Sequence, residues 1–431
     1  MIRRIQVRGY KSLHAIDLRL GRLTVVFGPN AAGKSNLFDA LRLLSSIVTR
    51  RTLAEAFSDH RGDPLEAMEC MSGGLQELLA KEQVGFSIEV DVELDARTVD
   101  GVEERIRARR AGMTDASEPV ASASRRVKER CLRYKVEVEM IPRTGVLRVC
   151  DETLQALREG NGELRPDERR KPFVERVGRR LRLRMEGQSR PTDYDLGLDY
   201  AIVSQPLYPP HYPHVTAFRE ELACWQFCYF EPRLMREENP LKEALTLTPS
   251  GGDLAAFYHT LNNMNPSQFA NIQKALSNLV PAIEALQIET TKEGKLRLQI
   301  QERGIQFSAK VASEGTLRIL GLLAILSSPT PTTVIGFEEP ENGVHPRRLK
   351  LIADLLQNAA ETKQVIVNTH SPTLPDYLQN AHLVRCARTD GHTLFETVEP
   401  LPLFRTSAIK QGLEEQPTPI SERILRGDFD E

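Results

Sequence analysis

The chain lacks the features of a membrane or secreted protein. Its apolar stretch ILGLLAIL (319–326) is far shorter than the roughly 18 residues that a membrane helix needs, and it predicts a buried helix instead. The N-terminus, MIRRIQVRGYKS, has no apolar segment followed by a small-residue cleavage site, so we expect no secretory signal. These absences predict a cytoplasmic protein without a membrane-spanning segment.

Cysteines are few and scattered. The six of them, at positions 70, 131, 150, 224, 228 and 386, include no Cys-x-x-Cys pair. Cys224 and Cys228 form the one close pair, and no second pair of metal ligands stands near them in the sequence. The pattern favours buried thiols in a reducing compartment over a disulfide framework or a metal site.

Long heptad runs and internal repeats are also missing, which speaks against an extended coiled coil or a repeat array. What remains is an ordinary globular composition: 431 residues, 40% hydrophobic and 27% charged, with a formal net charge of -2. That length suffices for one large or two ordinary domains with a substantial core.

Positive charge is concentrated in the middle of the chain. Residues 97–190 hold 24 Lys and Arg against 16 Asp and Glu, gathered in RIRARR (105–110), RRVKER (125–130) and RRLRLR (179–184). Two interpretations stay open: a solvated face of mixed charge, or a surface that binds a polyanion and releases counterions from its phosphates. Few aromatic residues stand among these runs, so a platform that stacks single-stranded bases is not favoured.

The stretch GPNAAGKS (28–35) fits the phosphate-binding pattern G-x-x-x-x-G-K-[ST]. A strand-like run, LTVVFG, leads into it, and LFDALRLLSSIV follows it at helical spacing. The two glycines let the backbone curl so that its N–H groups face phosphates at the start of a helix. Lys34 is expected to reach the β- and γ-phosphates of ATP, and the Ser35 hydroxyl to bind Mg²⁺. The predicted nucleotide-binding residues are Gly28, Pro29, Asn30, Ala31, Ala32, Gly33, Lys34, Ser35 and Asn36.

A second stretch, VIGFEEPENGVHP (334–346), supplies the acidic partner that a phosphate-binding loop needs at the end of a neighbouring strand. Alone, two adjacent glutamates fit a nucleotide site, a metal site or a solvated strand end. Together with the phosphate-binding loop, Glu338 is predicted to hold Mg²⁺ through its water shell, and Glu339 to act as general base on the attacking water. The usual first acid is Asp, so Glu338 keeps the charge but adds one methylene.

The rest of the sequence predicts a mixed α/β fold. The predicted elements are two strands around a turn in 2–27, antiparallel strands at 84–94, 133–140 and 145–150, a loop-and-helix insertion at 97–130, a proline-rich connection at 204–216, helical structure at 251–285, a β-hairpin at 295–309, and a loop leading into an apolar helix at 313–326. Two short β-branched runs, ending in GFEE and VNTHS, are separated by a helix, as in a parallel βαβ unit.

Two further motifs can be interpreted only together with the motifs around them. His370, in VNTHSP, ends the predicted strand after the acid pair, where a histidine can contact the γ-phosphate and report its presence. A lone histidine would otherwise be structural. The SEGT stretch (313–316) alone predicts only a helix cap.

Taken in order, GPNAAGKS, SEGT, GFEEPENGVHP and NTHSP resemble the motifs of an ABC-class ATPase head. The stretches RGYKSL, GPNAAGKSNLFDAL and EEPENGVHP resemble the RecF/SMC/OLD-like branch, specifically its stand-alone predicted ATPases of the AAA family, which have no Toprim domain. The likeness covers about 1–95 and 220–390, and 97–200 matches as a variable insertion. It implies an α/β fold: an ABC-type P-loop NTPase head with an antiparallel β subdomain and a helical or loop insertion.

The resemblance divides the chain into an N-terminal lobe with the P-loop (1–95), a basic insertion with β-strands (96–215), a C-terminal lobe (216–395) and a tail (396–431). It also implies that Ser313 and Gly315 contact the γ-phosphate of ATP held by a second copy of the chain. Two heads would then form a homodimer around two ATP molecules and separate after hydrolysis. Lys11 in the opening motif would approach the nucleotide, and no glutamine of the Q-loop type can be assigned.

Three functions stay open at this point. The first is an ATPase, using ATP and Mg²⁺, that acts as a switch or motor on DNA or RNA, or on a separately encoded nuclease or effector, in DNA repair or anti-phage defence. Only 61 residues follow His370, too few for the Toprim nuclease of OLD-type relatives, and the terminal DFDE is expected to be a charged tail. The alternatives are the nucleotide-binding subunit of an ABC transporter and an ATP-dependent protein scaffold. The long insertion and the EEPENGVHP turn speak against the transporter subunit.

Overall fold

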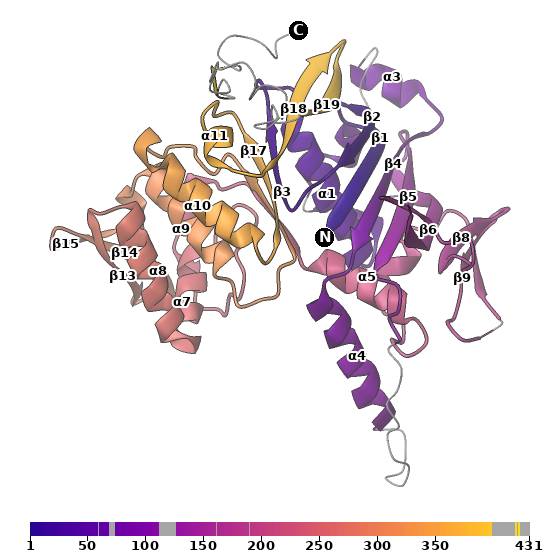
Figure 1. Cartoon of the computed structure of the whole chain (residues 1–431), viewed down its shortest axis with the longest axis horizontal. Coiled ribbons are helices and arrows are strands. Elements are labelled where there is room, and N and C mark those ends of the chain that lie inside the picture. Colours follow the sequence, from indigo (N-terminus) through magenta and orange to yellow (C-terminus); the bar gives the residue numbers. More distant parts are fainter. Residues whose placement is uncertain are drawn as a thin grey trace, which may run out of the picture. The chain divides into compact units, whose positions relative to one another are not determined.

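The computed structural model describes residues 1–58, 60–68, 74–111, 126–160, 162–188, 190–398, 419 and 421–422. Its contacts divide the chain into two compact units that interleave along the sequence (Figure 1). The first unit comprises Met1–Gly21, Asn30–Trp225 and Cys386–Glu396, and the second comprises Arg22–Pro29, Gln226–Arg385 and Thr397–Glu431. The four consecutive ranges inferred from the sequence divide the chain differently and stay a prediction. Cys70, Arg125, most of the tail and the DFDE stretch lie outside the described residues.

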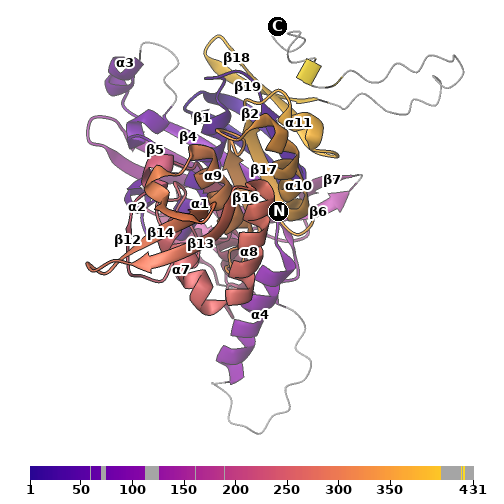
Figure 2. The ribbon, with the colours of Figure 1, turned by 90° about the vertical axis from the view of Figure 1, so that its left-hand side faces the viewer.

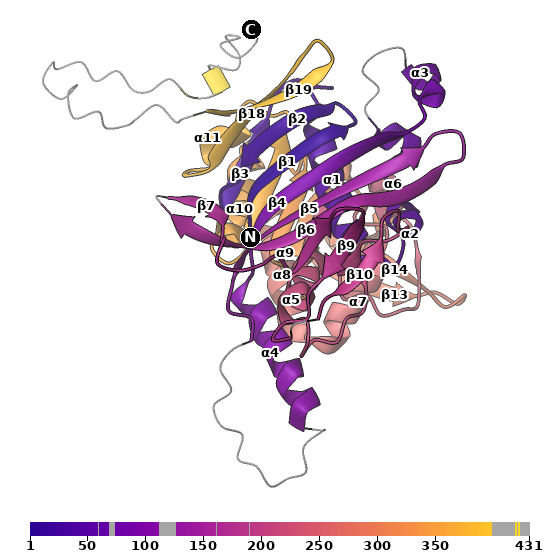
Figure 3. The same cartoon turned by 90° about the vertical axis from the view of Figure 1, so that its right-hand side faces the viewer.

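The first unit is built on an antiparallel sheet, whose strands β1, β4, β5 and β6 lie side by side in Figure 3. The strand order is β10-β9-β8-β6-β5-β4-β1-β2, with β7 paired to β6. The strand bounds are β1 Ile2–Tyr10, β2 Leu13–Arg19, β4 Val84–Glu93, β5 Cys131–Ile141, β6 Val146–Gly160, β7 Glu163–Pro166, β8 Val174–Val177, β9 Arg180–Leu183 and β10 Thr192–Asp195. The antiparallel strands predicted at 84–94, 133–140 and 145–150 are confirmed.

Strand β2 is missing from the sequence-based prediction, which places only two strands in 2–27. Its buried apolar residues, Leu13, Ile16 and Leu18, do not keep a period of two, so the stretch carries a weak strand signal. The strand forms because β1 offers an antiparallel partner, with Val7 opposite Ile16.

Helices cover the apolar face of this sheet. Along β5, buried and half-buried residues alternate strictly, the pattern of a strand with one face on a core. On the buried face Tyr134 packs against Phe218 of α5 (Pro213–Ala223), with ring centroids 5.0 Å apart. Helix α1 (Lys34–Thr49) contacts α5 through a hydrogen bond of 2.8 Å from Ser45 Oγ to the Leu222 carbonyl. The other described helices of this unit are α2 Leu53–Ser58, η1 Pro64–Ala67, α3 Gly74–Ala80, α4 Ala96–Ala111 and η2 Ile202–Ser204.

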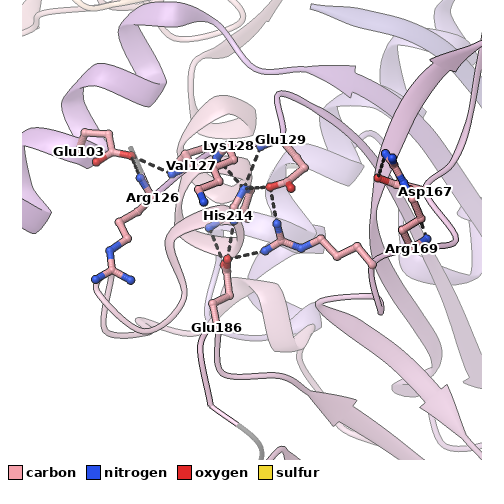
Figure 4. A network of polar contacts seen from close by, with 10 residues as sticks. Glu103, Arg126, Val127, Lys128, Glu129, Asp167, Arg169, Glu186 and His214 are labelled. Carbon is pink, nitrogen blue, oxygen red and sulfur yellow. Dashed lines mark hydrogen bonds and ion pairs between the residues drawn. The ribbon is translucent and has the colours of Figure 1, made fainter. Parts of the chain in front are cut away.

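A buried histidine ties together several segments of the predicted insertion (Figure 4). His214, in the first turn of α5, has no exposed surface, and its Nδ1 and Nε2 atoms each lie 2.7 Å from a carboxylate, of Glu186 and Glu129 respectively. Arg170 pairs with both carboxylates, and Phe173 stacks on the imidazole with ring centroids 4.7 Å apart. Residues far apart in the sequence are thereby fixed at one point.

The contacts at both ring nitrogens indicate that His214 is an imidazolium. Burial lowers its pKa, but the hydrogen bonds to Glu129 and Glu186 outweigh burial, and the pKa is raised above its ordinary value. The hydrogen bond to His214 in turn lowers the pKa of Glu129 to about 2. The backbone N–H groups of Lys128 and Glu129 also approach Nε2, at 3.1 and 3.2 Å, which suits a neutral ring. We favour the imidazolium because carboxylates 2.7 Å from both nitrogens require a proton on each.

The second unit is built on parallel strands. Strands β16, β17 and β3 lie next to one another, followed by β18. Their bounds are β3 Leu23–Phe27, β16 Val334–Glu338, β17 Gln364–Thr369 and β18 His382–Thr389. Helix α10 (Leu349–Ala360) connects β16 to β17, which confirms the predicted parallel βαβ unit. Strand β18 runs on into the first unit, and β11 (Trp225–Cys228) and β19 (His392–Val398) also cross the boundary between the units.

A small antiparallel sheet and its helices complete the second unit. Helix α8 packs against β13, and α7 against β14 (Figure 2). The hairpin predicted at 295–309 is confirmed as β14 and β15. The stretch predicted to be helical at 251–285 consists of two helices. The second helix ends at Leu279, earlier than predicted, and β13 begins at Ile283. The bounds are α6 Pro232–Met235, β12 Asn239–Pro240, α7 Leu254–Met264, α8 Pro266–Leu279, β13 Ile283–Thr290, β14 Lys295–Glu302, β15 Ile305–Ser308, η3 Ala309–Val311, α9 Glu314–Leu326, η4 Pro346–Arg348 and α11 Leu374–Tyr377.

One apolar cluster joins the layers of the second unit. It includes Val25, Ile335 and Val367 from the parallel strands, Phe257 from α7 and Leu320 from α9. Helix α9 is buried over most of its length, as the apolar stretch ILGLLAIL predicts. Within the ranges given above, no helix combines the length and apolar character needed to cross a membrane.

Candidate active site

Three strand ends meet at one edge of the parallel sheet in the second unit. Strand β3 leads into Gly28, β16 ends at Glu338, and β17 leads into His370. The parallel pairing places the last residues of β3 and β17 opposite each other, and Glu338 opposite Asn368. Ligands of α/β proteins bind outside the carboxyl ends of such strands. This edge therefore collects the start of the phosphate-binding loop, the acid pair and the predicted sensor histidine.

The phosphate-binding loop spans both units: Gly28 and Pro29 belong to the second, and Asn30, Ala31, Ala32, Gly33, Lys34, Ser35 and Asn36 to the first. In the first unit a chain of hydrogen bonds holds the loop. Asn36 Nδ2 donates to Ser12 Oγ at 2.7 Å, the Ser12 and Thr393 hydroxyls lie 2.6 Å apart, and Thr393 Oγ1 donates to the Ala32 carbonyl at 2.8 Å. Sequence reasoning missed Ser12 and Thr393 because the two lie 381 residues apart.

Only glycine fits at position 33. Gly33 has φ +106°, and a Cβ there would lie 2.0 Å from Thr393 Oγ1. Helix α1 begins at Lys34, a residue that is 5% exposed, and Ser35 is half-buried beside it. The first turn of α1 has no acidic residue, so no negative side chain there competes with an anion at the positive end of the helix.

Lys11, from the turn between β1 and β2, is paired with a buried carboxylate. Its Nζ donates to Asp39 Oδ2 at 2.7 Å and to the Arg61 carbonyl at 3.2 Å. Asp39 lies on α1 and is 4% exposed. The charge of Lys11 thus helps to hold α1 in the first unit, and its approach to a nucleotide stays a prediction.

Glu339 and His370 are in direct contact in the second unit. Glu339 Oε1 lies 2.8 Å from His370 Nε2, and the two side chains are 37% and 33% exposed. Asn342 Nδ2 donates to Glu339 Oε2 at 3.1 Å, and the backbone N–H of Glu339 donates to the Asn368 carbonyl at 2.8 Å. Glu339 has φ +48°, a conformation that a non-glycine residue keeps only where its surroundings hold it. Both residues were assigned to the site from sequence; their contact was not predicted.

A third carboxylate, Glu341, was missed by sequence reasoning. Its Oε1 accepts hydrogen bonds from the Thr369 hydroxyl and, at 3.3 Å, from the Ser371 N–H. Burial raises the pKa of Glu341 above its ordinary value; these two donors oppose the rise, and the Glu339 carboxylate adds to it. The spacing E-x-E gives no hint of these partners, because Thr369 follows Glu341 by 28 residues.

Ser313 and Gly315 shape the start of α9. Ser313 Oγ accepts a hydrogen bond from the Thr316 N–H at 3.2 Å, which makes Ser313 the N-cap, as SEGT alone predicts. A Cβ on the buried Gly315 would lie 2.1 Å from the carbonyl oxygen of Gly343. Only glycine therefore allows the turn after β16 to pack against the first turn of α9. Contact of this helix start with ATP stays a prediction.

A family model described as "AAA domain, putative AbiEii toxin, Type IV TA system" matches residues 23–95 and 229–376, just over half of the chain. The chain belongs to this AAA-domain family. A stretch of 44 residues is also 46% identical to the OLD nuclease of Thermus scotoductus (strain ATCC 700910 / SA-01). That stretch is 10% of this chain and 8% of the relative, so the chain spans a small fraction of the nuclease.

Solved structures similar to this AAA-domain protein include SMC heads. An SMC head bound to the C-terminal winged-helix domain of ScpA matches with a TM-score of 0.54 and 11% identity, covering 92% of this chain and 98% of that one. The SMC head with an extended coiled coil bound to the C-terminal domain of ScpA, derived from Pyrococcus furiosus, matches with a TM-score of 0.52 and 10% identity, covering 95% and 98%. The fold is that of an ABC-type P-loop ATPase head, and the predicted resemblance to the SMC and OLD-like branch is confirmed.

The residues expected at a magnesium site fit that ion in this AAA-domain protein. Mg²⁺ prefers oxygen ligands and keeps several waters, so one hydroxyl and one carboxylate from the protein suffice. Ser35 and Glu338 are such residues, both half-buried. Within the part of the chain that the structure describes, no three His, Cys, Asp or Glu residues gather as ligands of another metal centre. Burial raises the pKa of Cys224 to about 11, which favours the neutral thiol expected from sequence.

The arginines of RRLRLR are paired with acids in the first unit. Arg182 Nε lies 2.8 Å from Asp193 Oδ1, and Arg180 Nε lies 3.5 Å from Asp195 Oδ1. The antiparallel register of β9 and β10 puts each pair directly opposite. Arg184 pairs with Glu175 of β8. The positive charge that the sequence shows at 179–184 is therefore largely balanced on the folded surface.

The arginines of α4 differ from those of β9. Helix α4 projects away from the sheet of its unit (Figure 1). Arg105 pairs with Glu220 of α5, whereas Arg107 and Arg109 are exposed and form no ion pair with another described residue. Arg109 lies 5.6 Å from the ring centroid of Tyr208. The basic residues that stay exposed thus include these arginines of α4 and, in RRVKER, Arg126, Lys128 and Arg130.

Proposed function

We propose that this AAA-domain protein binds and hydrolyses ATP, dimerises around the nucleotide, and acts as a switch or motor on nucleic acid or on a nuclease partner. The observation that carries the proposal is the edge of the parallel sheet, where the start of the phosphate-binding loop, the acid pair and His370 end neighbouring strands. Family membership and the ABC-type fold support it.

The proposed chemistry assigns one task to each element. Backbone N–H groups of the loop and Lys34 bind the phosphates and align the γ-phosphorus with a water molecule. Ser35 and Glu338 would hold Mg²⁺, which supplies positive charge to the β- and γ-phosphates when bound. Glu339 takes a proton from the water, whose oxygen forms a bond to the γ-phosphorus while the bond to the ADP oxygen breaks. ADP and phosphate leave, and Glu339 returns its proton to solvent.

The contact between Glu339 and His370 gives the proposed reaction a gate. His370 Nε2 lies 2.8 Å from Glu339 Oε1, so the histidine and the attacking water would compete for that carboxylate. The γ-phosphate of ATP offers His370 another acceptor. We infer that its presence draws the imidazole away and frees the base, which is how the histidine would sense the nucleotide.

A second copy of the chain would complete each site through the start of α9. Ser313 is exposed there, and the helix presents the positive end of its dipole together with N–H groups of its first turn. In the proposed dimer this helix end of one copy meets the γ-phosphate held by the other. Hydrolysis then sets how long the two copies stay together.

Mixing two inactive variants tests this arrangement. Lys34→Ala loses phosphate binding in its own site, and Ser313→Arg blocks the site of its partner. Mixed in equal amounts, they should recover about a quarter of the wild-type ATP turnover, because half of random dimers are mixed and each holds one intact site of two. Turnover that stays at the level of the separate variants, with both folded and able to dimerise, would contradict composite sites.

The nucleic-acid part of the proposal has its own test. Changing Arg107 and Arg109 to Gln on α4 should weaken binding to DNA or RNA and reduce the slope of log affinity against log salt by about two. The matched control changes Arg180 and Arg182 to Gln on β9, where the charges are already paired, and should leave affinity nearly unchanged. If the wild-type protein shows no salt-dependent binding to DNA or RNA, the alternative of a protein scaffold gains support. Co-purification with a membrane permease would support the alternative of a transporter subunit.

A further inference from the structure

The turn after β16 folds back onto the end of β17 through one side chain. Glu341 Oε1 accepts from the Thr369 hydroxyl and from the Ser371 N–H at 3.3 Å. The Ser371 N–H also lies 2.9 Å from Thr369 Oγ1, so the three groups form a closed set of hydrogen bonds. Thr369 has no exposed surface. These contacts hold the chain on both sides of His370.

The same carboxylate stands two residues after Glu339. The Asn342 N–H donates to the Glu339 carbonyl at 3.0 Å, so Glu339 and Glu341 belong to one tight turn. Glu339 has φ +48°, a conformation that contacts on either side of the turn help to maintain. Glu341 supplies an anchor toward β17. One side chain thus links both members of the pair in which Glu339 Oε1 and His370 Nε2 lie 2.8 Å apart.

The turn has a second anchor on α9. The Gly343 carbonyl would lie 2.1 Å from a Cβ on Gly315, so the backbones of the turn and of the helix start are in close contact. Gly343 itself has φ +73°. Two further links hold the turn against β17: the hydrogen bond of 2.8 Å from the Glu339 N–H to the Asn368 carbonyl, and the Glu341 side chain. Removing that carboxylate should let the turn shift while α9 stays in place.

Glu341 does not have the surroundings of a second base. Its Oε1 is already occupied by two donors, and its Oε2 is buried without a hydrogen-bond partner among the described residues. The oxygen without a partner, Oε2, is thus shielded from bulk water. The unpartnered Oε2 also means that an amide nitrogen could take its place without meeting another donor.

We infer that Glu341 is a positioning residue that keeps the turn of Glu339 next to the strand end of His370, so that both groups stay at the site when their direct contact opens. The inference rests on the proposed ATPase function. It assigns to Glu341 a hydrogen-bonding task that needs an acceptor at Oε1 and no negative charge. Gln should therefore replace Glu341, whereas Ala should not.

ATP turnover by full-length variants tests the assignment. Glu341→Ala should lower kcat about 10- to 100-fold with little change in the KM for ATP, because misplaced groups slow the chemical step without weakening phosphate binding. Glu341→Gln should retain most of the wild-type kcat. Thr369→Val removes the partner hydroxyl, and adding it to Glu341→Ala should cost little more than Glu341→Ala alone. Glu243→Ala, at an exposed position of the same unit, is the matched control.

Two outcomes would overturn the assignment: a folded Glu341→Ala protein with wild-type kcat, or a Glu341→Gln protein as impaired as Glu341→Ala. If wild-type protein shows no turnover that depends on Lys34, the proposed function fails and hydrogen–deuterium exchange decides about Glu341 separately. Exchange in residues 366–374 should then be faster in Glu341→Ala than in wild type and Glu341→Gln. Equal exchange in all three proteins would end the inference.

Discussion

Two histidines contact carboxylates in this molecule, one in each compact unit, and their settings differ. His214 is fully buried, and each ring nitrogen lies 2.7 Å from a different glutamate (Figure 4). His370 is 33% exposed, and the described contact engages Nε2 with Glu339, itself 37% exposed. The first network is closed by Arg170 and covered by Phe173. The second opens toward the edge where parallel strands end.

The difference separates a structural role from a chemical one. A buried imidazolium between two carboxylates is stable only while every partner stays in place, so it fixes the fold. A half-exposed pair costs little to separate, so a ligand that offers new partners can rearrange it. We therefore expect substitutions at His214 to change stability, and substitutions at His370 to change turnover.

Of the two histidine variants, His370→Ala should have the larger effect on activity. If His370 binds the γ-phosphate as proposed, its loss should lower ATP turnover on the order of 100-fold or more, because stabilisation of developing charge is lost. The midpoint of thermal unfolding should hardly move, since the side chain is partly exposed. Steady-state turnover and calorimetry on the same preparation check both statements. A large fall in the midpoint of thermal unfolding with normal turnover would instead give His370 a structural role like that of His214.

His214→Ala should show the opposite pattern. Removing one partner from a buried charged network leaves Glu129 and Glu186 without it, and should lower the free energy of unfolding by about 3–5 kcal/mol. Turnover per folded molecule should stay unchanged. Denaturant unfolding monitored by circular dichroism measures the first quantity, with His211→Ala, at an exposed histidine just before α5, as control.

The pH dependence of this loss follows from the two shifted groups. The pKa of His214 is raised in the folded state, so its stabilisation is full below the ordinary value of 6.5 and is lost as pH rises through the raised value. The pKa of Glu129 is lowered from 4.5 to about 2, so its share is full above 4.5 and is lost as pH falls toward 2. Wild type and His214→Ala should therefore differ most between these limits, and a difference that peaks above pH 8 would contradict the charged network.

Replacing Glu152 should produce a smaller effect on stability, visible in how the free energy of unfolding changes with pH. This buried carboxylate accepts hydrogen bonds from Tyr134 and from the backbone at Ile202 and Val203, and burial raises its pKa from 4.5 to about 7. Its contribution is complete below pH 4.5 and is lost as pH rises through about 7, at most about 3 kcal/mol. Glu152→Gln should be less stable overall, but its free energy of unfolding should fall less between pH 5 and 7. Parallel pH curves would refute the assignment.

Arg182→Gln should have the smallest effect. The ion pair with Asp193 joins neighbouring strands on the surface, where solvent screens the charges. The thermal midpoint should not change measurably, which makes this variant a reference for charge loss outside the His214 network. A clear drop in the midpoint would show that surface pairs in the first unit matter more than their exposure indicates.

Features set by residues close together in the sequence could be predicted, and contacts between residues far apart in the sequence could not. The phosphate-binding loop, the acid pair and the βαβ unit were predicted because each is a local pattern, and parallel strands bring their ends together by a general rule. Glu341 and Thr369 were missed because their contact links two neighbouring strand ends across 28 residues. The same holds for His214 and Glu129, separated by 85 positions. Strand β2 was not predicted because pairing with β1, more than its own sequence pattern, decides its conformation.

Of the features predicted from sequence, the charge of the folded surface was the hardest to predict. RRLRLR indicated a positive surface, but register places Asp193 and Asp195 opposite its arginines. A cluster counted along the chain says little about the folded surface until strand pairing is known. The exposed arginines of α4 keep the nucleic-acid prediction open to test.

The most direct test of the account is Glu339→Gln, measured for ATP binding, ATP turnover and molecular mass in solution. Gln keeps the size of the side chain but cannot take a proton from water. The variant should bind ATP, hydrolyse it at least about 100-fold more slowly than wild type, and accumulate as a dimer in the presence of ATP. Near-normal turnover by the folded Glu339→Gln protein would contradict the role of Glu339 and with it the proposed site.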